Sequence, residues 1–496
     1  MNPILIGFIV YLFVVLIVGV IAYRRTQSQA GFVLGDRKLN GWILAFSERA
    51  SGESAWLLVG LPGAALAMGF LELWTVIGCT TGILISWTFV AKRLREEVGR
   101  TDSMTLPDFL RRRYPDSSEA IRVVGSLIIT FFFTFYVAAQ FNGAGKVLDT
   151  TFDEMMLGLQ SWVASSMGLT VETTTLGMVI GALIVLFYTT MGGFVAVAWT
   201  DVVQGIIMVF TCVLLPLIGW FEFGGSETLV PAIKQEGAHL LSVTGGESGW
   251  KAALGVIGGL SWGLGYLGQP HLLMRYMAFR SASDVRKARL IAIWWAVPAF
   301  WGAFLIGIVG LGAYGTGHFE DPERLMPFMA QTLLPGWLAG IMISGAIAAM
   351  MSTADSQLLV TTSTLSEDVI KRFFRRKATA EELAVFSRGA TLVVGLLAFV
   401  LAVASTDVVF RMVSFAWSGL SAAFGPGLLL TLWWKRTSGD GVLAGMIGGT
   451  LTVVAWRLLG WDAFLTERVS GVAVAVLLVV VVSLLRPSKP SAEAVA

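Results

Sequence analysis

One long apolar segment of this chain is interrupted by the sequence Trp262-Gly263-Leu264-Gly265-Tyr266-Leu267-Gly268-Gln269-Pro270. Glycine and proline are poor helix formers, so the helix expected for such an apolar segment should break here. Non-helical backbone is tolerated at membrane depth only where protein or a water-lined cavity satisfies its amide and carbonyl groups. The stretch therefore predicts a broken membrane helix beside a ligand site.

The composition of the whole chain indicates a membrane protein with many helical spans. Of 496 residues, 55% are hydrophobic and only 14% are charged, and the mean hydropathy is +0.75. The hydrophobic residues fall in blocks of about twenty, the length at which a helix crosses a hydrocarbon core. We therefore predict an all-α polytopic membrane protein with about 13 transmembrane helices, at residues 3–23, 41–68, 71–91, 119–148, 174–192, 195–221, 253–277, 287–315, 335–366, 383–404, 408–433, 441–460 and 467–485.

The charges in the links between these spans predict an orientation. Cations gather in alternate links, at Arg24 and Arg25, 92–113, 275–289, 371–377, Lys435 and Arg436, and Arg486 and Lys489. Such links face the cytoplasm. The N-terminus is then expected outside and the C-terminal tail 487–496 in the cytoplasm, with the protein in a bacterial-type inner (plasma) membrane. The first apolar run has no basic segment before it, so we expect a retained helix and not a cleaved signal.

Signals for enzymatic chemistry are absent from the sequence. Cys79 and Cys212 both fall inside predicted spans, and His239, His271 and His318 are scattered. There is also no P-loop, paired-histidine zinc motif or nucleophile elbow. We therefore expect a transporter driven by an ion gradient, with no enzymatic activity, no nucleic-acid binding and no obligate protein partner.

A second span has the same unusual character. It contains Ser47-Glu48-Arg49-Ala50-Ser51-Gly52-Glu53-Ser54-Ala55-Trp56 and continues to Gly60, Pro62 and Gly63. The two broken spans lie five spans apart, which predicts two inverted halves at about 41–221 and 253–433. Residues 1–486 would then form one transmembrane domain, with helices 3–23, 441–460 and 467–485 at its periphery.

At these motifs the chain resembles the sodium/solute symporters, and most closely their sodium/proline symporter branch. The resemblance covers nearly the whole chain and rests on residues 54–63, Ala198-Trp199-Thr200-Asp201, residues 262–271, Met351-Ser352-Thr353 and Ser356-Gln357-Leu358-Leu359-Val360. It implies a 5+5 inverted-repeat core of the LeuT type and alternating access to a site at the middle of the membrane.

The chemistry of a sodium site fits the predicted breaks. A desolvated Na⁺ prefers oxygen ligands, which an unwound helix supplies as carbonyls and a neighbouring helix as hydroxyls. The resemblance implies a primary Na⁺ held by backbone oxygens of Ala50, Glu53 and Ala349 and by the hydroxyls of Ser352 and Thr353. It also implies a second cation or proton site, which we assign to Asp201, Asp355 and Ser356.

A substrate site is expected where the two breaks meet. The helix end near Ser54 offers free amide groups to a carboxylate, while Trp262 and Tyr266 lie four residues apart and could form a wall against a small ring carrying an ammonium group. The resemblance places the proline pocket at Ser54, Trp56, Gly60, Tyr136, Trp262, Tyr266 and Pro270.

Three ionisable residues depart from the family pattern in the expected ion region. Gly52 and Glu53 stand where an aspartate and a methionine are usual, Arg49 replaces a small residue, and Asp355 replaces a hydroxyl or small residue. Arg49 could pair with Glu53 one turn away, or either could pair with Asp355 or Asp201 across helices. Arg49 could also occupy part of a cation site, while Glu53 or Asp355 could carry a proton. The sequence thus predicts symport of L-proline with Na⁺, and leaves open H⁺ coupling and another small amino acid or a monocarboxylate as substrate.

Overall fold

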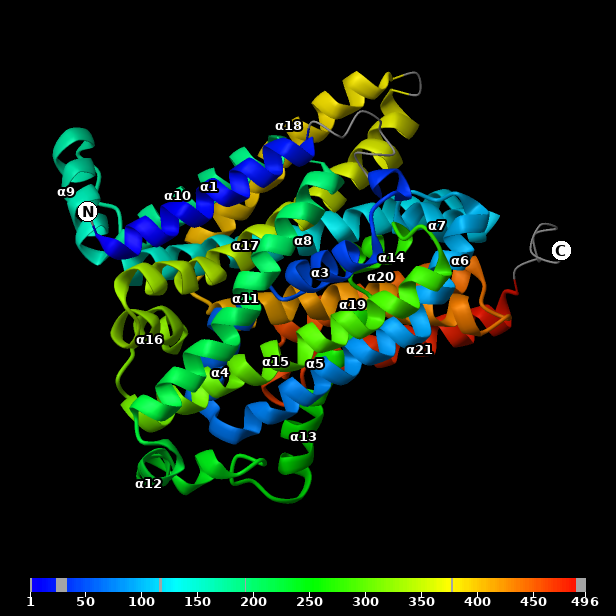
Figure 1. The fold of residues 1–496 in the computed structure, drawn as a ribbon. Helices are drawn as coiled ribbons and strands as arrows, with labels where there is room; N and C mark the ends of the chain where they lie inside the picture. The colour runs from blue at the N-terminus through cyan, green and yellow to red at the C-terminus, as the bar shows by residue number, and fades with distance from the viewer. Residues whose placement is uncertain (1, 24–33, 116–117, 192, 376–377, 488–496) are drawn as a thin grey trace.

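Long helices make up most of the computed structural model, which describes residues 2–23, 34–115, 118–191, 193–375 and 378–487. They lie close to the predicted segments, because apolar runs of this length satisfy their backbone groups most simply as helices. The long helices are α1 Pro3–Tyr23, α8 Ser118–Thr151, α10 Thr173–Met191, α11 Phe194–Glu222, α15 Ala282–Tyr314, α17 Gly336–Thr364, α18 Ala380–Ala404, α19 Val409–Trp433, α20 Gly439–Leu458 and α21 Glu467–Leu485 (Figure 1).

Ten helical stretches among the described residues are long and apolar enough to cross a membrane. The three remaining predicted spans are 41–68, 174–192 and 253–277. The first and the last are broken helices. In the middle one, the apolar helical part among the described residues, Thr173–Phe187, is too short to count as a membrane span. The all-helical membrane fold is confirmed, while the number thirteen stays a prediction.

The two expected breaks are both present. The first broken helix consists of α3 Gly41–Gly52, the π-helical turn Trp56–Gly60 and α4 Leu61–Met68. The second consists of α13 Gly249–Leu260, the 3₁₀ segment η7 Ser261–Leu267 and α14 Pro270–Met277.

Several links that the sequence analysis treats as simple connections are helical. They are α7 Leu106–Arg113, α9 Asp153–Met167, α12 Gly225–Glu236 and α16 Leu325–Leu333, together with the turns η1 Gly35–Arg37, η3 Gly69–Glu72, η6 Ala238–Leu241, η8 Pro322–Arg324, η9 Leu365–Phe374 and η10 Trp461–Ala463. The span at 71–91 also continues beyond its predicted end, as α5 Leu73–Ile85, η4 Ser86–Val90 and α6 Ala91–Thr101.

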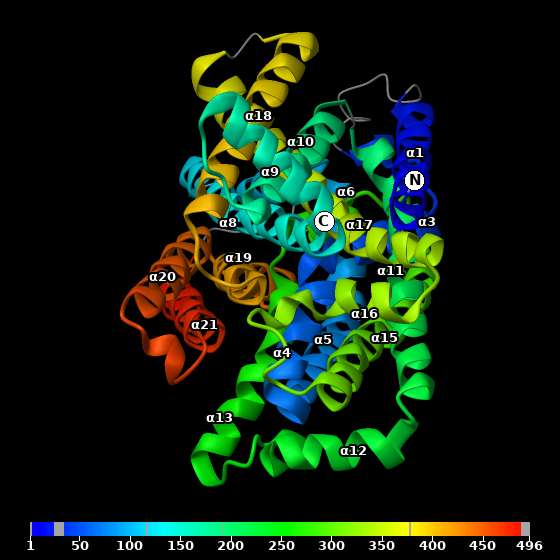
Figure 2. The same cartoon turned by 90° about the vertical axis from the view of Figure 1, so that its left-hand side faces the viewer.

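The broken helix that begins with α3 lies at the centre of the molecule. It packs against α11, α14, α15 and α17. Of these helices, α11 carries Asp201, α14 begins at Pro270, and α17 carries the expected ion-site residues Ala349, Ser352, Thr353, Asp355 and Ser356. Helix α1 packs on α11 and α17, whereas α20 and α21 pack on each other and on α19, so that Figure 2 shows them on opposite sides of the molecule. Helix α21 also contacts η7, although the sequence analysis places it at the periphery.

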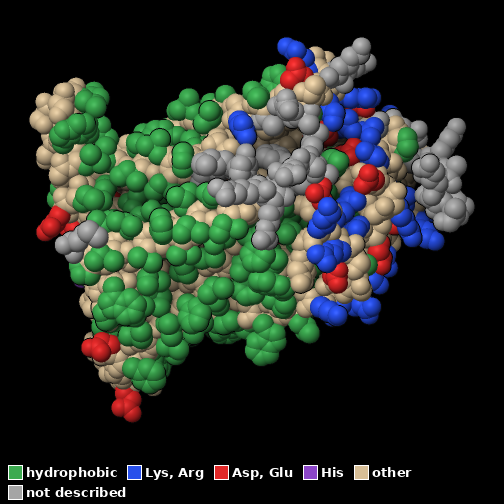
Figure 3. All heavy atoms as spheres, turned by 45° about the horizontal axis from the view of Figure 1, so that its top comes forward, with side chains coloured by type: hydrophobic (Ala, Val, Ile, Leu, Met, Phe, Trp, Pro, Cys, Tyr) green, Lys and Arg blue, Asp and Glu red, His purple; other side chains and the backbone are tan. Residues whose placement is uncertain are grey.

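The surface separates into an apolar band and a charged end. Figure 3 shows hydrophobic side chains over the broad middle of the molecule and Lys and Arg side chains gathered at one end. Figure 1 places α6, α7 and the last turn of α21 at that end. A band of exposed apolar side chains with cations collected at one end is the surface expected of a polytopic membrane protein.

Candidate functional site

The break in the first broken helix centres on a single residue. Helix α3 ends at Gly52, and Glu53 leaves the helical conformation (φ −110°, ψ 18°) before helical structure resumes. Residues 43–45 and 47–63 are all buried, so the carbonyls released at the end of α3 must find partners within the protein. The partners come from α17.

Two adjacent hydroxyls of α17 meet the carbonyls of α3. Ser352 Oγ lies 2.9 Å from the Ala50 carbonyl oxygen and 3.1 Å from that of Ala349. Thr353 Oγ1 lies 2.9 Å from the Ser51 carbonyl oxygen. Four of the five residues expected around the primary Na⁺ therefore lie on the same contact between α3 and α17, and they offer the oxygen ligands that a hard cation prefers.

The fifth expected residue, Glu53, is engaged differently. Its carbonyl oxygen accepts a hydrogen bond from the Leu57 amide at 3.3 Å. Its carboxylate points to a buried arginine, since Arg49 Nη1 lies 2.6 Å from Glu53 Oε1. The Tyr266 hydroxyl also donates to the Glu53 carboxylate, at 3.1 Å from Oε2.

Arg49 is held by two carboxylates, and we name Glu48, Arg49 and Glu53 the Arg49 triad. Arg49 Nε donates to Glu48 Oε2 at 2.5 Å, and its Nη2 forms a second, very short contact with Glu48 Oε1. This bidentate geometry is the preferred one for a guanidinium on a carboxylate. Trp87 Nε1 and the Tyr276 hydroxyl each donate to Glu48 at 3.0 Å. Of the pairings considered from the sequence, the structure contains the one between Arg49 and Glu53.

Asp201 pairs with an arginine that the sequence analysis counts among the cations of a link. Arg275 is wholly buried in α14, and its Nη2 lies 3.3 Å from Asp201 Oδ2. The assignment of Arg275 to a surface link is therefore wrong, because α14 turns this residue towards α11 and the interior. Ser47 and Ser51 of α3 also donate to Asp201 Oδ2, at 2.6 and 3.0 Å.

The second expected cation site gathers around the same arginine. Arg275 Nη2 donates to Ser356 Oγ at 2.5 Å, and Ser51 Oγ lies 2.9 Å from Ser356 Oγ. Asp355 is buried beside Ser356, whose hydroxyl lies 3.4 Å from Asp355 Oδ1. Among the described residues, Asp201 Oδ1 and Asp355 Oδ2 are buried without a hydrogen-bond partner. Two buried carboxylate oxygens without a hydrogen-bond partner are suited to bind a cation, whose positive charge would offset theirs.

Aromatic side chains from the two broken helices meet next to this region. The rings of Trp56 and Trp262 lie 4.6 Å apart, and the hydroxyls of Ser54 and Tyr136 lie 3.5 Å apart. Trp56 Nε1 is buried and has no hydrogen-bond partner among the described residues. The Tyr266 ring lies 4.9 Å from that of Trp417 in α19.

The glycines of η7 permit this packing. A Cβ at Gly263 would lie 2.4 Å from the Gly78 carbonyl oxygen, and one at Gly265 would lie 1.6 Å from Trp417 Nε1. Larger residues at either position would force η7 away from α5 or α19. The glycine pattern that predicts the break therefore also sets how closely the aromatic residues approach.

Of the other two expected substrate residues, Gly60 lies beside this aromatic region, whereas Pro270 lines a separate small cavity. A Cβ at Gly60 would contact Phe410 at 3.5 Å, and the Phe410 ring lies 5.1 Å from that of Trp262. Pro270 begins α14 and lines a small cavity together with Ile129, Met274 and others. Phe410 and Trp417 are neighbours of the site that the sequence analysis missed, and so are the polar residues Ser47, Glu48, Ser51 and Arg275. The polar residues of α3 carried a signal, because they fall in an otherwise apolar span.

Comparisons with known proteins define the class to which this arrangement belongs. Residues 32–449 match the model of the sodium:solute symporter family. The chain is 38% identical to the high-affinity proline transporter PutP of Bacillus subtilis (strain 168), over 95% of each chain. It is also 38% identical to a sodium/proline symporter of Escherichia coli (strain K12), over 98% of this chain and 93% of that protein.

The fold agrees with the same class. A Na⁺-coupled sialic acid symporter in a substrate-bound outward-open state superimposes with a TM-score of 0.77 over 99% of this chain, at 19% identity. MhsT in complex with L-phenylalanine superimposes with a TM-score of 0.55 at 14% identity. The protein is a membrane transporter and not an enzyme. It belongs to the sodium:solute symporter family.

Proposed function

We propose that this protein is a Na⁺-coupled symporter of L-proline that works by alternating access. The observation that carries the proposal is the contact of the Ser352 and Thr353 hydroxyls with the main chain of the α3 break, directly beside the aromatic region of Trp56 and Trp262. The relatives named as proline transporters support the choice of substrate. The substrate is then the principal partner, together with the lipid bilayer.

In this proposal, a bound Na⁺ takes over from the hydroxyl hydrogen bonds that now connect α17 to α3. Ser352 and Thr353 now donate to carbonyls of Ala50, Ala349 and Ser51. A bound Na⁺ would turn these hydroxyls into ligands alongside carbonyls of Ala50, Glu53 and Ala349, so that five oxygens hold α3 against α17. The Glu53 carbonyl oxygen accepts a hydrogen bond from the Leu57 amide, and its second lone pair would serve the ion.

Proline would then complete the pocket next to this ion. Its carboxylate fits the start of the helical turn after Glu53, where Ser54 Oγ and the buried Trp56 Nε1 provide donors. Its ring would lie among Tyr136, Trp262 and Tyr266, with Gly60 leaving room on one side and Pro270 ending the broken segment. Aromatic faces attract an ammonium group, which suits the charged nitrogen of proline.

Coupling follows from the shared break. The ion and the substrate both contact residues 50–56, so binding of one orders the backbone that the other needs. One positive charge that moves inward down about 100 mV releases about 2.3 kcal/mol, which allows about fiftyfold accumulation of the substrate per ion.

A second coupling ion at Asp201, Asp355 and Ser356 forms a further part of the proposal. The orphaned oxygens Asp201 Oδ1 and Asp355 Oδ2 support it. Arg275 pairs with Asp201 and reaches Asp355 only through the Ser356 hydroxyl, so the two carboxylates would carry one negative charge more than this arginine balances when both are ionised. Either Na⁺ or H⁺ could supply that charge, and the choice between them decides the stoichiometry. The Arg49 triad has the same imbalance.

The proposed membrane orientation places the cation-rich end at the cytoplasm, with the N-terminus outside, the C-terminus inside and the protein in a bacterial-type inner membrane. The gathered Lys and Arg side chains of Figure 3 support it, because cytoplasmic segments carry the excess of these residues.

The decisive experiment is uptake of radiolabelled L-proline into proteoliposomes under an imposed Na⁺ gradient or an imposed pH gradient, at matched membrane potential. Uptake with the Na⁺ gradient is the expected result. Uptake with the pH gradient alone would make this an H⁺ symporter. Absence of uptake in both would reject proline, and competition by other small amino acids and monocarboxylates would then identify the substrate class.

A further inference from the structure

A buried arginine from the last helix lies against the tryptophan of the proposed pocket. Arg468, in the first turn of α21, is 4% exposed, and its guanidinium carbon lies 4.1 Å from the centre of the Trp262 ring. A guanidinium over a tryptophan face is the most favourable cation–π pair, and its energy grows when water is excluded. The sequence analysis left α21 at the periphery and gave Arg468 no role.

The same guanidinium fixes the backbone around Trp262. Arg468 Nε lies 3.1 Å from Ser261 Oγ, immediately before Trp262, and Nη1 lies 2.6 Å from Ser414 Oγ in α19. Nη2 reaches the Gly258 carbonyl oxygen at 3.5 Å. One side chain thus joins α21 to the end of α13, to η7 and to α19, and the rigid fork of arginine suits such a junction better than the point charge of lysine.

A buried carboxylate lies close to Arg468 and is connected to it through the Ser414 hydroxyl. Glu467 is buried at 3% exposure, and its Oε1 accepts from Ser414 and Ser418 at 3.3 and 3.4 Å. Trp417 of α19 adds a further constraint, because its Nε1 donates to the Trp262 carbonyl oxygen at 3.1 Å. Trp262 is therefore held at its ring by Arg468 and at its backbone by α19.

We propose that Arg468 is a positioning residue of the substrate pocket, which holds the Trp262 ring in the orientation that receives the substrate. The proposal deepens the proposed function and rests on it for the identity of the substrate. It makes α21, which lies outside both five-helix halves, a part of the binding site. Loss of Arg468 should weaken substrate binding without stopping the movements that follow it.

The test combines transport with a direct probe of Trp262. Arg468→Met keeps the length of the side chain and removes its charge, whereas Arg468→Lys keeps a cation. The matched control is Arg457→Met in α20, because Arg457 also lies over an aromatic ring, at 5.9 Å from Phe415, but bonds to Asp407 away from the pocket. Each protein is labelled with 5-fluorotryptophan, and the Trp262 resonance in the ¹⁹F NMR spectrum is identified by its absence in Trp262→Phe.

We expect Arg468→Met to shift or broaden the Trp262 resonance without any substrate, and to raise the KM for proline about tenfold while Vmax changes less than about twofold. Arg468→Lys should restore part of the KM, and Arg457→Met should change neither readout. An unmoved resonance overturns the proposal whatever the substrate is. A moved resonance with an unchanged KM also overturns it, and equal loss of Vmax in Arg468→Met and Arg457→Met would indicate a merely structural role.

A wild-type protein that moves no proline would reject the proposed substrate and not the contact between Arg468 and Trp262, which the NMR arm measures alone. If Arg468→Met does not fold, Arg468→Lys carries the same test, with a smaller expected shift and rise in KM.

Discussion

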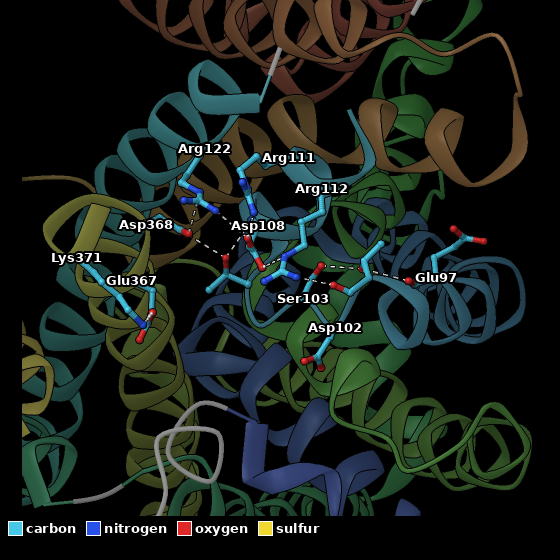
Figure 4. Close-up of polar contacts among 12 residues, drawn as sticks. Glu97, Asp102, Ser103, Asp108, Arg111, Arg112, Arg122, Glu367, Asp368 and Lys371 are labelled. Carbon is cyan, nitrogen blue, oxygen red and sulfur yellow. Dashed lines mark hydrogen bonds and ion pairs between the residues drawn. The ribbon is translucent and has the colours of Figure 1, made fainter. Parts of the chain in front are cut away.

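The Arg49 triad and the ion-pair cluster around Asp108 are built from the same residue types but in opposite proportions. In the triad, one arginine serves two carboxylates, and the side chains of Arg49, Glu48 and Glu53 have no exposed surface. Asp108, by contrast, forms ion pairs with three arginines, Arg111, Arg112 and Arg122, at 3.4, 2.9 and 2.9 Å (Figure 4).

The second cluster also reaches solvent. The Arg112 side chain is 42% exposed, and the cluster lines a cavity with Asp368 and Lys371 of η9. Water can take the place of the exposed Arg112 there, whereas no partner in the triad is open to water. The comparison teaches that the number of ion pairs says little by itself. Their burial and their charge balance decide what each pair contributes to stability.

The largest effect should follow removal of the guanidinium from the triad. Arg49→Met leaves the carboxylates of Glu48 and Glu53 buried together, so we expect the free energy of unfolding to fall by about 5 kcal/mol. Thermal unfolding of the purified protein in detergent measures this loss. The double variant Arg49→Met with Glu48→Gln should recover about half of it, because one uncompensated charge is gone. An Arg49→Met protein as stable as the wild type would contradict the assigned charge balance.

A smaller loss is expected at the second buried arginine. Arg275→Met removes the partner of Asp201, which keeps the hydroxyls of Ser47 and Ser51, and should lower the free energy of unfolding by about 3 kcal/mol. If a cation binds there, added Na⁺ should raise the thermal stability of Arg275→Met by more than it raises that of the wild type. Equal stabilisation of both proteins by Na⁺ would count against a cation next to Asp201.

The hydroxyls of α17 should affect ion binding more than folding. Ser352→Ala removes one ligand of the proposed Na⁺ site and one hydrogen bond, so we expect the apparent affinity for Na⁺ in proline uptake to fall about tenfold and the stability to fall by about 1 kcal/mol. Thr361→Ala is the matched control, because its hydroxyl donates to the Gln357 carbonyl of the same helix. If uptake by the two variants depended on Na⁺ in the same way, Ser352 would not be a ligand of the ion.

The smallest effect should appear in the exposed cluster. Arg112→Met leaves Asp108 with Arg111 and Arg122, so the free energy of unfolding should fall by less than about 1 kcal/mol. Thermal unfolding at low and high salt checks this prediction, because any loss should shrink as salt screens the remaining charges. A loss as large as that of Arg49→Met would remove the distinction between the two regions.

The sequence predicted the two breaks because their cause is local. Glycine and proline at residues 262–270 cannot form a regular apolar helix, and the polar run at residues 47–54 does not belong in lipid. The resemblance implied which oxygens surround the ion, and in the structure Ser352 contacts the Ala50 carbonyl while Thr353 contacts that of Ser51. The ion ligands themselves stay a prediction. The pairing of Arg49 with Glu53 was one of several pairings considered, since four residues of helix bring the two within reach.

The partners across helices could not be predicted in this way. Arg275 followed an apolar run and resembled a cation of a surface link, and Arg468 belonged to a helix outside both predicted halves. Each contacts a residue of the candidate site because a neighbouring element presents an acceptor or a ring, at Asp201 and Trp262. A hydropathy pattern indicates where a residue lies along a span, but it does not indicate which other helix packs against that residue.

The sequence by itself determined that this protein is a helical membrane transporter with two interrupted spans, because the length of an apolar segment and the conformational limits of glycine and proline are properties of the chain alone. Only the tertiary structure decided which charges compensate one another and which side chains hold the pocket. Those interactions join residues far apart in the sequence, and a buried charge is stable only when the packing of several helices delivers its partner to the right place.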